Sequence, residues 1–470
     1  MRATSRAGAR RPATAPFSAC AASMSSHAPD AGASGGPRGA RDWLRRVVPV
    51  QSREVRLLVW SFLYFFCLLA AYYMIRPLRD EMAVQYGADR LQHLFSATFL
   101  TMVALIPAFG WVASRLPVER LLPVVYTTVI GLLVVFWVLF TGGAERTAVA
   151  PFFFVFVSVF NLFVISVFWS FMADIWNTEA ARRLFGVISA GGSLGAIAGP
   201  AAARWLVSSV GLDGLLLAAA ATLALALVCI AALLQLSGKR GVMKRGDDGA
   251  PKASLWIGVI RIARSPYLLG IAVFVLSYTV LGTLLYFLQV SLVGDAISDS
   301  AERTRLFATV DLAVNVLTLL LQFFLTGPLL SRIGATAMLV ALPVLSVLGF
   351  VALGLWTLLP VLVVVGVLRR AGEFAISKPT RETLFTVVDH VDKYQAKNVI
   401  DTVIHRGGDA ASSWFAAGLK AAGLGLSGMA WVGVPVALVW LGVAWALGRE
   451  HERRRTQASK RGPAEPEMSA

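Results

Sequence analysis

Apolar runs of about 20 residues recur along the chain, and no other feature of the sequence restricts the fold as strongly. Each run has roughly the length that a helix needs to cross a hydrocarbon core of about 30 Å. Hydrophobic residues make up 57% of the 470 residues and charged residues only 15%, whereas charged residues are about a quarter of a typical soluble domain. Lipid offers no partners for backbone polar groups, so the runs must be helices. The sequence therefore predicts an all-α, multi-pass membrane protein with the lipid bilayer as a partner.

The runs divide into two groups of six, separated by a polar linker. We expect about twelve spans, at residues 57–75, 94–113, 121–140, 150–173, 185–209 and 214–236, and then at 267–292, 306–325, 335–356, 360–375, 399–422 and 429–447. The expected organisation is a disordered cytoplasmic tail (1–46), an N-terminal six-helix bundle (47–236), a cytoplasmic linker (237–266), a C-terminal six-helix bundle (267–447) and a basic cytoplasmic tail (448–470).

The basic residues predict the orientation of the chain. The net charge is +16, and Lys and Arg concentrate in alternate loops, in the linker and in both tails. Because such loops stay in the cytoplasm, both termini and the linker are expected there. Topology thus explains the charge, and no nucleic acid partner is expected. The first 40 or so residues have the composition of disordered segments. Their scarcity of acidic residues also suits a transit peptide. Met24 offers a second possible start of translation.

The two halves carry matching residues at nearly one spacing. Three features recur 216 or 217 positions later: the segment at Gly110 recurs at Gly327, the pair Gly191-Gly192 at Gly407-Gly408, and Arg204 as Lys420. This agreement predicts a duplication whose halves are related by an axis along the membrane normal. Chance matching of small residues is the alternative.

The segments at Gly110 and Gly327 resemble the Gly-x-x-x-Asp-Arg signature that follows the second span in the major facilitator superfamily. Ser114 and Ser331 stand where the signature has its acid, while the Arg is retained. The charge latch that the acid forms is therefore not expected here. The resemblance implies two six-helix bundles that rock around a central site, which is the fold of a secondary transporter.

Three polar segments together resemble the ATP/ADP translocase (nucleotide transporter) family of bacteria and plastids. They are Arg-Pro-Leu-Arg-Asp-Glu at 76–81, Phe-Trp-Ser-Phe at 168–171 with Glu-Ala-Ala-Arg-Arg-Leu-Phe at 179–185, and Lys-Pro-Thr-Arg-Glu at 378–382 with Ala-Lys at 396–397 and Ile-Asp at 400–401. Lys378 replaces an acid of that family, and Ala396 replaces a Gly. The resemblance implies carriage of an anionic metabolite, such as a nucleotide, by exchange or by coupling to a proton or other ion, in a bacterial inner membrane.

Four basic residues are the predicted substrate ligands: Arg76, Arg79, Arg381 and Lys397. All lie at or near the ends of predicted spans, where side chains reach water. Guanidinium groups bind phosphate or carboxylate in a bidentate manner. The alternative for each residue is that it snorkels to the interface and anchors its helix. The family resemblance favours a substrate role for Arg79 and Lys397.

Acids within spans are candidates for coupling or gating, because an acid in lipid is costly and is often paired or protonated. Asp311 lies inside the eighth span with Asn315 one helical turn away. The two residues either couple or gate transport, or form structural hydrogen bonds. Asp401 lies one turn beyond Lys397, where an intrahelical ion pair would position that Lys.

Two further acids lie near the cytoplasmic ends of the fourth and tenth spans. Asp174 and Glu373 could form gating latches with Arg182, Arg183 or Arg369 that break during transport.

Three glycines in the fifth span indicate close helix packing. Gly191, Gly195 and Gly199 recur every fourth residue, and small residues at this spacing let helices approach. The same segment satisfies the pattern Gly-x-Ser-x-Gly, but that nucleophile needs a strand-to-helix elbow, which a membrane helix does not provide.

The sequence offers little for other chemistry. It has no Walker-type phosphate loop, and its five His form no metal constellation. We therefore expect no cofactor, no metal and no enzymatic activity. Three alternatives stay open: a major-facilitator transporter of another small solute, a membrane-embedded enzyme that uses His390 and His405 with nearby acids, and a non-transporting sensor.

Overall fold

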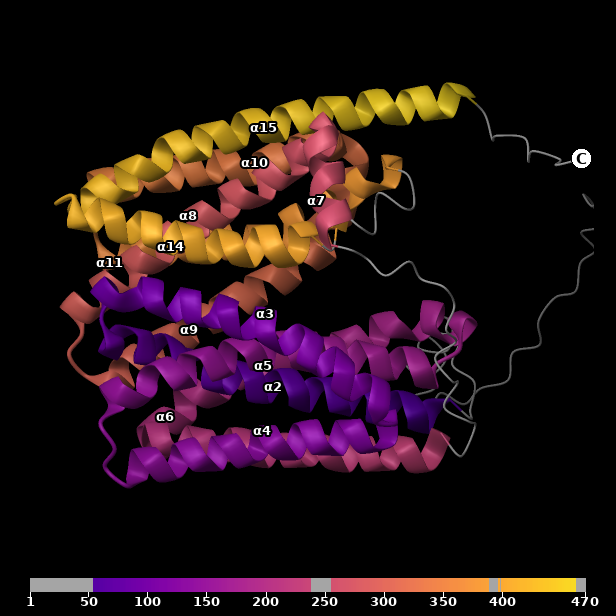
Figure 1. The fold of residues 1–470 in the computed structure, drawn as a ribbon, viewed down its shortest axis with the longest axis vertical. Helices are drawn as coiled ribbons and strands as arrows, with labels where there is room; N and C mark the ends of the chain where they lie inside the picture. Colours follow the sequence, from indigo (N-terminus) through magenta and orange to yellow (C-terminus); the bar gives the residue numbers. More distant parts are fainter. Residues whose placement is uncertain (1–53, 238–254, 389–395, 398, 462–470) are drawn as a thin grey trace, which may run out of the picture. The chain divides into compact units, whose positions relative to one another are not determined.

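The computed structural model describes residues 54–237, 255–388, 396–397 and 399–461, and these consist of helices joined by short turns (Figure 1). The predicted disordered tail, most of the predicted linker, His390 and the end of the basic tail lie outside these residues.

Five helices build the N-terminal half: α2 (Val55–Tyr86), α3 (Leu91–Arg115), α4 (Val118–Thr141), α5 (Arg146–Ile175) and α6 (Thr178–Ser237). α6 has 60 residues, and a straight helix of that length would be about 90 Å long, far more than a bilayer needs. Gly211 turns the chain inside α6 with a φ of 72°, a conformation that glycine adopts readily. α6 therefore supplies both the fifth and the sixth span.

The C-terminal half is more broken. Its helices are α7 (Leu255–Arg264), α8 (Pro266–Ala296), α9 (Ser300–Leu321), α10 (Gly327–Leu355), α11 (Leu359–Gly372), α12 (Lys378–Leu384), α14 (His405–Ala421) and α15 (Leu426–Arg461). Three π-helical turns, at Gln322–Thr326, Glu373–Ser377 and Ile400–Ile404, interrupt its helical runs. Such turns occur frequently at functional sites.

The helices account for the expected crossings. Within the described residues, nine helices are long and apolar enough to cross a membrane, and α6 among them supplies two spans. The predicted tenth and eleventh spans correspond to the helical runs at 359–384 and 400–421, which π-helical turns interrupt. The predicted all-α fold with about twelve spans is thus confirmed.

The first span extends further than the sequence predicted. α2 continues to Tyr86 instead of ending near residue 75. Pro77 inside it removes only one backbone donor, and the charged residues from Arg76 onward find partners inside the protein. The sequence prediction ended the span at the first charged residue, where the apolar run stops, whereas the helix itself continues. Likewise the segments at Gly110 and Gly327, predicted as loops, belong to α3 and α10.

The two halves meet through a few helices: α2 and α6 contact α9, α3 contacts α14, and α2 also contacts α8. We call the end of the bundle where Gly87 joins α2 to α3 the α2–α3 end. There Arg303 of α9 donates to both oxygens of the fully buried Glu81 of α2, at 2.7 and 2.8 Å. Lys420 of α14 pairs with Asp89 at 2.5 Å. The buried Glu81–Arg303 pair therefore joins the halves at the α2–α3 end, and the Asp89–Lys420 pair, whose carboxylate is 77% exposed, is a weaker contact there.

Candidate functional site

A cavity of about 310 Å³ lies between the two halves. Its wall comes from α2, α3 and α5 of the N-terminal half and from α8, α9, α11, α12 and α14 of the C-terminal half. Six basic and three acidic side chains line it: Arg76, Arg79, Arg369, Arg370, Lys378 and Arg406, with Asp80, Glu373 and Asp409. The wall therefore carries a surplus of positive charge.

Two of the predicted ligands, Arg76 and Arg79, line the cavity from α2. The Arg79 guanidinium pairs with Asp80, with Nη2 2.6 Å from Oδ1, and lies 5.0 Å from the centre of the Phe154 ring. Tyr286 of α8 donates to the same Asp80 oxygen at 3.1 Å. Both arginines are partly buried, at 16% and 15% side-chain exposure, and contribute to the cavity wall.

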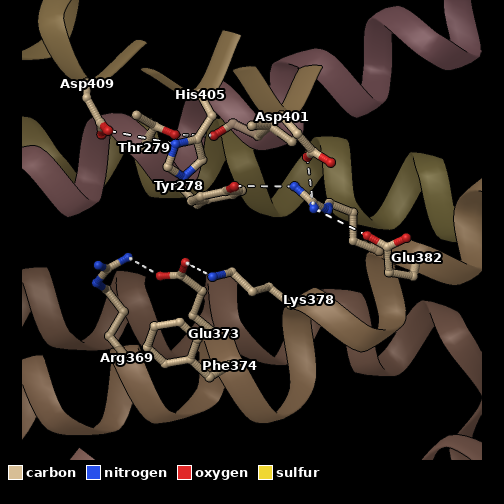
Figure 2. A network of polar contacts seen from close by, with 12 residues as sticks. Tyr278, Thr279, Arg369, Glu373, Phe374, Lys378, Glu382, Asp401, His405 and Asp409 are labelled. Atoms are coloured by element: carbon tan, nitrogen blue, oxygen red, sulfur yellow. Dashed lines mark hydrogen bonds and ion pairs between the residues drawn. The ribbon is translucent and has the colours of Figure 1, made fainter. Parts of the chain in front are cut away.

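The second basic group follows α11 into α12, and Figure 2 shows Glu373 between Arg369 and Lys378. The two nitrogen-to-oxygen distances are 3.7 and 3.8 Å, longer than hydrogen bonds. The Arg369 side chain is only 7% exposed, yet its Nε and Nη1 have no hydrogen-bond partner among the described residues. Buried donors without partners are costly, and both nitrogens are shielded from solvent.

Gly282 of α8 makes room for this guanidinium. A Cβ placed on Gly282 would lie 3.2 Å from Arg369 Nη2, which is a tight contact. The small residue therefore allows Arg369 to lie against the α8 backbone at the cavity wall.

α14 adds a third polar group, of which the sequence named only His405, and only for the alternative of a membrane-embedded enzyme. Asp409 lies 3.7 Å from His405 Nδ1 and 3.6 Å from Arg406 Nη1, and the His405 ring lies 5.6 Å from that of Tyr278 (Figure 2). All four side chains line the cavity.

An aromatic wall completes the cavity. The ring centres of Phe95, Phe154 and Tyr286 lie between 5.6 and 6.5 Å apart. Rings at these distances form an apolar surface with edge-to-face contacts. The cavity thus combines basic groups with an aromatic face.

The other two predicted ligands, Arg381 and Lys397, do not belong to the residues that line the cavity. Arg381 pairs with Asp401 at 3.0 Å and with Glu382 at 3.4 Å, and Lys397 pairs with Glu382 at 2.5 Å. The predicted Lys397–Asp401 pair is replaced by these contacts with α12. A regular helix would be needed for that pair, whereas Asp401 lies in the π-helical turn Ile400–Ile404.

The predicted coupling residues of α9 both contact other helices. Asp311 Oδ1 accepts from Arg76 at 3.0 Å and from Arg370 at 2.7 Å. Asn315 donates to the carbonyl of Ala196 in α6 at 2.8 Å. Both residues therefore join α9 to the N-terminal half, and their role in coupling or gating stays a prediction.

Of the predicted latches, the structure records the ion pair between Arg369 and Glu373, which lies within one helical run. Asp174 lies exposed near the end of α5, and Arg183 pairs with Glu54 at 3.2 Å. Whether Asp174 or Glu373 acts as a latch stays a prediction.

The three glycines of the fifth span lie against α2. A Cβ on Gly191 or Gly199 would lie 2.5 Å from a backbone oxygen of α2, that of Phe62 or Ala70 respectively, and one on Gly195 would overlap the Phe66 oxygen. Helix backbones this close leave no space for a side chain.

The site residues that sequence reasoning missed are mostly in the tenth and eleventh spans: Arg370, Lys378 as a cavity residue, Arg406 and Asp409, with His405 named only for the enzyme alternative. A signal existed for some of them. Arg369 and Arg370 fall inside the predicted span at 360–375, and charged residues within spans often mark substrate pathways.

Comparisons with known proteins place the chain in a family. The model of the Major Facilitator Superfamily matches residues 61–377. The chain is 23% identical over 398 residues to ADP,ATP carrier protein 1 of Chlamydia pneumoniae, covering 76% of this chain and 69% of that protein. It is 26% identical over 250 residues to ADP,ATP carrier protein 2 of the same organism, covering 47% and 46%.

Among solved structures, the fold matches a bacterial homologue of the human lysosomal transporter Spinster, crystallised in an inward-facing and unoccupied conformation. The TM-score is 0.53 at 15% identity, and the match covers 87% of this chain and 98% of the other. At this identity the likeness concerns the fold alone.

Proposed function

Because the chain belongs to the Major Facilitator Superfamily, whose members are transporters, we propose that it carries an anionic metabolite by alternating access, with a nucleotide such as ADP or ATP as the leading candidate. One observation carries the proposal. The cavity between the halves is lined by six basic and three acidic side chains, and a buried, positively charged site attracts anions.

The lack of hydrogen-bond partners at one of these basic groups supports an anionic substrate more strongly than the number of basic groups does. Arg369 lies in the cavity wall with two guanidinium nitrogens lacking hydrogen-bond partners among the described residues. Phosphate and carboxylate oxygens match such a fork of donors. A substrate anion that draws the Arg369 side chain towards the cavity would give these two shielded nitrogens hydrogen-bond partners.

Two observations favour a nucleotide over other anions. The curated relatives are named ADP,ATP carriers, and the triad of Phe95, Phe154 and Tyr286 offers an aromatic surface beside Arg79. Flat bases stack on aromatic side chains. A base on this wall would leave its phosphates near the basic groups.

We further propose an orientation and a state. If Lys- and Arg-rich loops are cytoplasmic, the α2–α3 end faces away from the cytoplasm of a bacterial inner membrane. The Glu81–Arg303 and Asp89–Lys420 ion pairs at that end then belong to a carrier closed on the outer side. The solved structure with the matching fold was likewise described as inward-facing.

Uptake by purified protein in liposomes tests the proposal. Vesicles loaded with ADP would be given labelled ATP, ADP, inorganic phosphate or a dicarboxylate, with and without an imposed proton gradient. We expect saturable uptake of at least one nucleotide. Stimulation by internal ADP would indicate exchange, and stimulation by the gradient would indicate proton coupling.

The control for this assay is Arg369→Gln, which removes the charge and shortens the side chain while keeping a polar amide. Uptake of an uncharged solute by the folded protein, without uptake of any anion, would overturn the anion assignment. Uptake of phosphate or dicarboxylate alone would exclude the nucleotide.

A further inference from the structure

Asp311 is the most deeply buried carboxylate that touches the basic wall of the cavity. Its side chain is 2% exposed, and its Oδ1 accepts from both Arg76 Nη1 at 3.0 Å and Arg370 Nη2 at 2.7 Å. Its Oδ2 has no hydrogen-bond partner among the described residues. One carboxylate oxygen thus serves two guanidinium groups, while the other remains unsatisfied.

The three side chains differ in their access to the cavity. Arg76 and Arg370 both line it, whereas Asp311 is not among the lining residues. The two arginines that hold this carboxylate therefore also contribute to the cavity wall. An anion in the cavity can reach the same two guanidinium groups that Asp311 holds.

Charge and hydrogen bonding favour an exchange in which Arg76 and Arg370 leave Asp311 and bind an anionic substrate. Two arginines and one aspartate leave an excess of one positive charge, and a buried oxygen without a donor is destabilising. A phosphate presents several oxygens and can bind each guanidinium through two of them. The substrate can therefore offer the arginines more hydrogen bonds than Asp311 does.

The same contact also joins the two halves. Arg76 belongs to α2 in the N-terminal half, while Asp311 and Arg370 belong to α9 and α11 in the C-terminal half. One turn further along α9, Asn315 bonds to Ala196 of α6. Drawing Arg76 away from Asp311 would remove one of the links between the halves near the cavity.

We propose that Asp311 is an internal competitor of the substrate: it holds Arg76 and Arg370 while the cavity is empty, and an anionic substrate displaces it and thereby weakens a link between the halves. The inference rests on the proposed function, that an anion binds in the cavity. Asp311 is accordingly a positioning residue, which acts on substrate through the two arginines.

The test is equilibrium binding of ADP and of inorganic phosphate to purified Asp311→Asn in lipid nanodiscs. Removing a competitor should tighten binding of at least one of these probes by roughly tenfold relative to the unsubstituted protein. A purely structural role predicts the opposite, because arginines without a carboxylate to orient them would bind more weakly. Unchanged or weaker binding by the folded variant would overturn the inference.

A charge-matched control separates competition from the loss of a negative charge. Asp409→Asn also removes one negative charge from the cavity wall, and the ion pairs that Asp409 makes among the described residues lie within α14. Cysteines at Asp89 and Lys420, in a protein lacking its three native cysteines, would be joined by a short bifunctional thiol reagent. Without ligand, Asp311→Asn should lower the rate of cross-linking and Asp409→Asn should not. Equal cross-linking rates in the two variants would overturn the claim that Asp311 links the two halves.

Two further experiments cover the remaining outcomes. If Asp311→Asn does not fold, binding by the double variant D311N/R370Q is compared with binding by R370Q alone. The double variant keeps the net charge of the group formed by Arg76, Asp311 and Arg370. Tighter binding by the double variant supports competition, and equal binding contradicts it. If the unsubstituted protein binds neither ADP nor phosphate while cross-linking still responds to Asp311→Asn, the anionic substrate is rejected and only the link between halves survives.

Discussion

Arg369 and Arg381 lie twelve residues apart in one interrupted helical run, and their side chains are almost equally buried, at 7% and 9% exposure. Their partners differ. The nearest carboxylate oxygen of Glu373 is 3.7 Å from Arg369, whereas Arg381 has an oxygen of Asp401 at 3.0 Å, one of Glu382 at 3.4 Å and the Tyr278 hydroxyl at 3.4 Å. Arg369 lines the cavity and Arg381 does not.

The comparison shows that burial and residue type together do not identify a ligand. A guanidinium surrounded by acceptors has its charge neutralised within the protein, and it serves to hold helices together. A guanidinium that faces a cavity with few acceptors retains hydrogen-bonding capacity for a substrate. The predictions below test this distinction, in order of decreasing effect on transport.

Arg369→Gln is expected to have the largest effect. Loss of charged hydrogen bonds to the substrate should lower the initial rate of ADP uptake about 100-fold, which corresponds to about 2.7 kcal/mol. Uptake is measured in liposomes and normalised to folded protein, and Arg369→Lys should retain part of the activity. An uptake rate within about threefold of the unsubstituted protein would remove Arg369 from the binding site.

Gly282→Ala tests the position of the same guanidinium without changing its charge. The new Cβ would lie 3.2 Å from Arg369 Nη2, so the Arg369 side chain must shift. We expect the KM for ADP to rise roughly fivefold, equivalent to about 1 kcal/mol, with little change in thermal stability. In an Arg369→Gln background the substitution should have no further effect on KM; an equal rise there would place the cause elsewhere.

Arg381→Gln should affect the stability of the protein more than its transport, the opposite of what is expected for Arg369→Gln. The variant loses the ion pairs with Asp401 and Glu382, but these carboxylates are 34% and 45% exposed and can be hydrated. We expect about 1 kcal/mol of destabilisation, seen as a lower melting temperature, and less than about threefold loss of uptake per folded molecule. A loss as large as that of Arg369→Gln would abolish the distinction drawn here.

Lys397→Gln should have the smallest effect. Lys397 and Glu382 are 35% and 45% exposed, and ion pairs of this kind contribute about 0–1 kcal/mol. The uptake rate and the melting temperature should both stay close to those of the unsubstituted protein. Glu382→Gln is the matched partner variant, and a strong uptake defect confined to Lys397→Gln would restore this Lys as a substrate ligand.

Several parts of the site could be predicted from the sequence. Arg76 and Arg79 were found because charged residues interrupt an apolar run, and the glycines at 191, 195 and 199 were found from their helical spacing. Arg370 and Lys378 were missed as cavity residues. The place of Lys378 in the wall depends on the π-helical turn Glu373–Ser377, which changes the angular position of every residue after it and leaves no clear mark in the sequence. Arg370 precedes that turn, and its contact with Asp311 of α9 depends on how two helices pack.

The sequence by itself determined the class of the fold, because apolar runs of about 20 residues can satisfy their backbones in lipid only as helices. It also determined the number of spans, since each run is one membrane thickness long. Only the tertiary structure decided which charges are available to a substrate. Ion pairs form between helices distant in sequence, as Arg76 with Asp311 and Arg303 with Glu81 show, and local residue patterns contain no information about such partners.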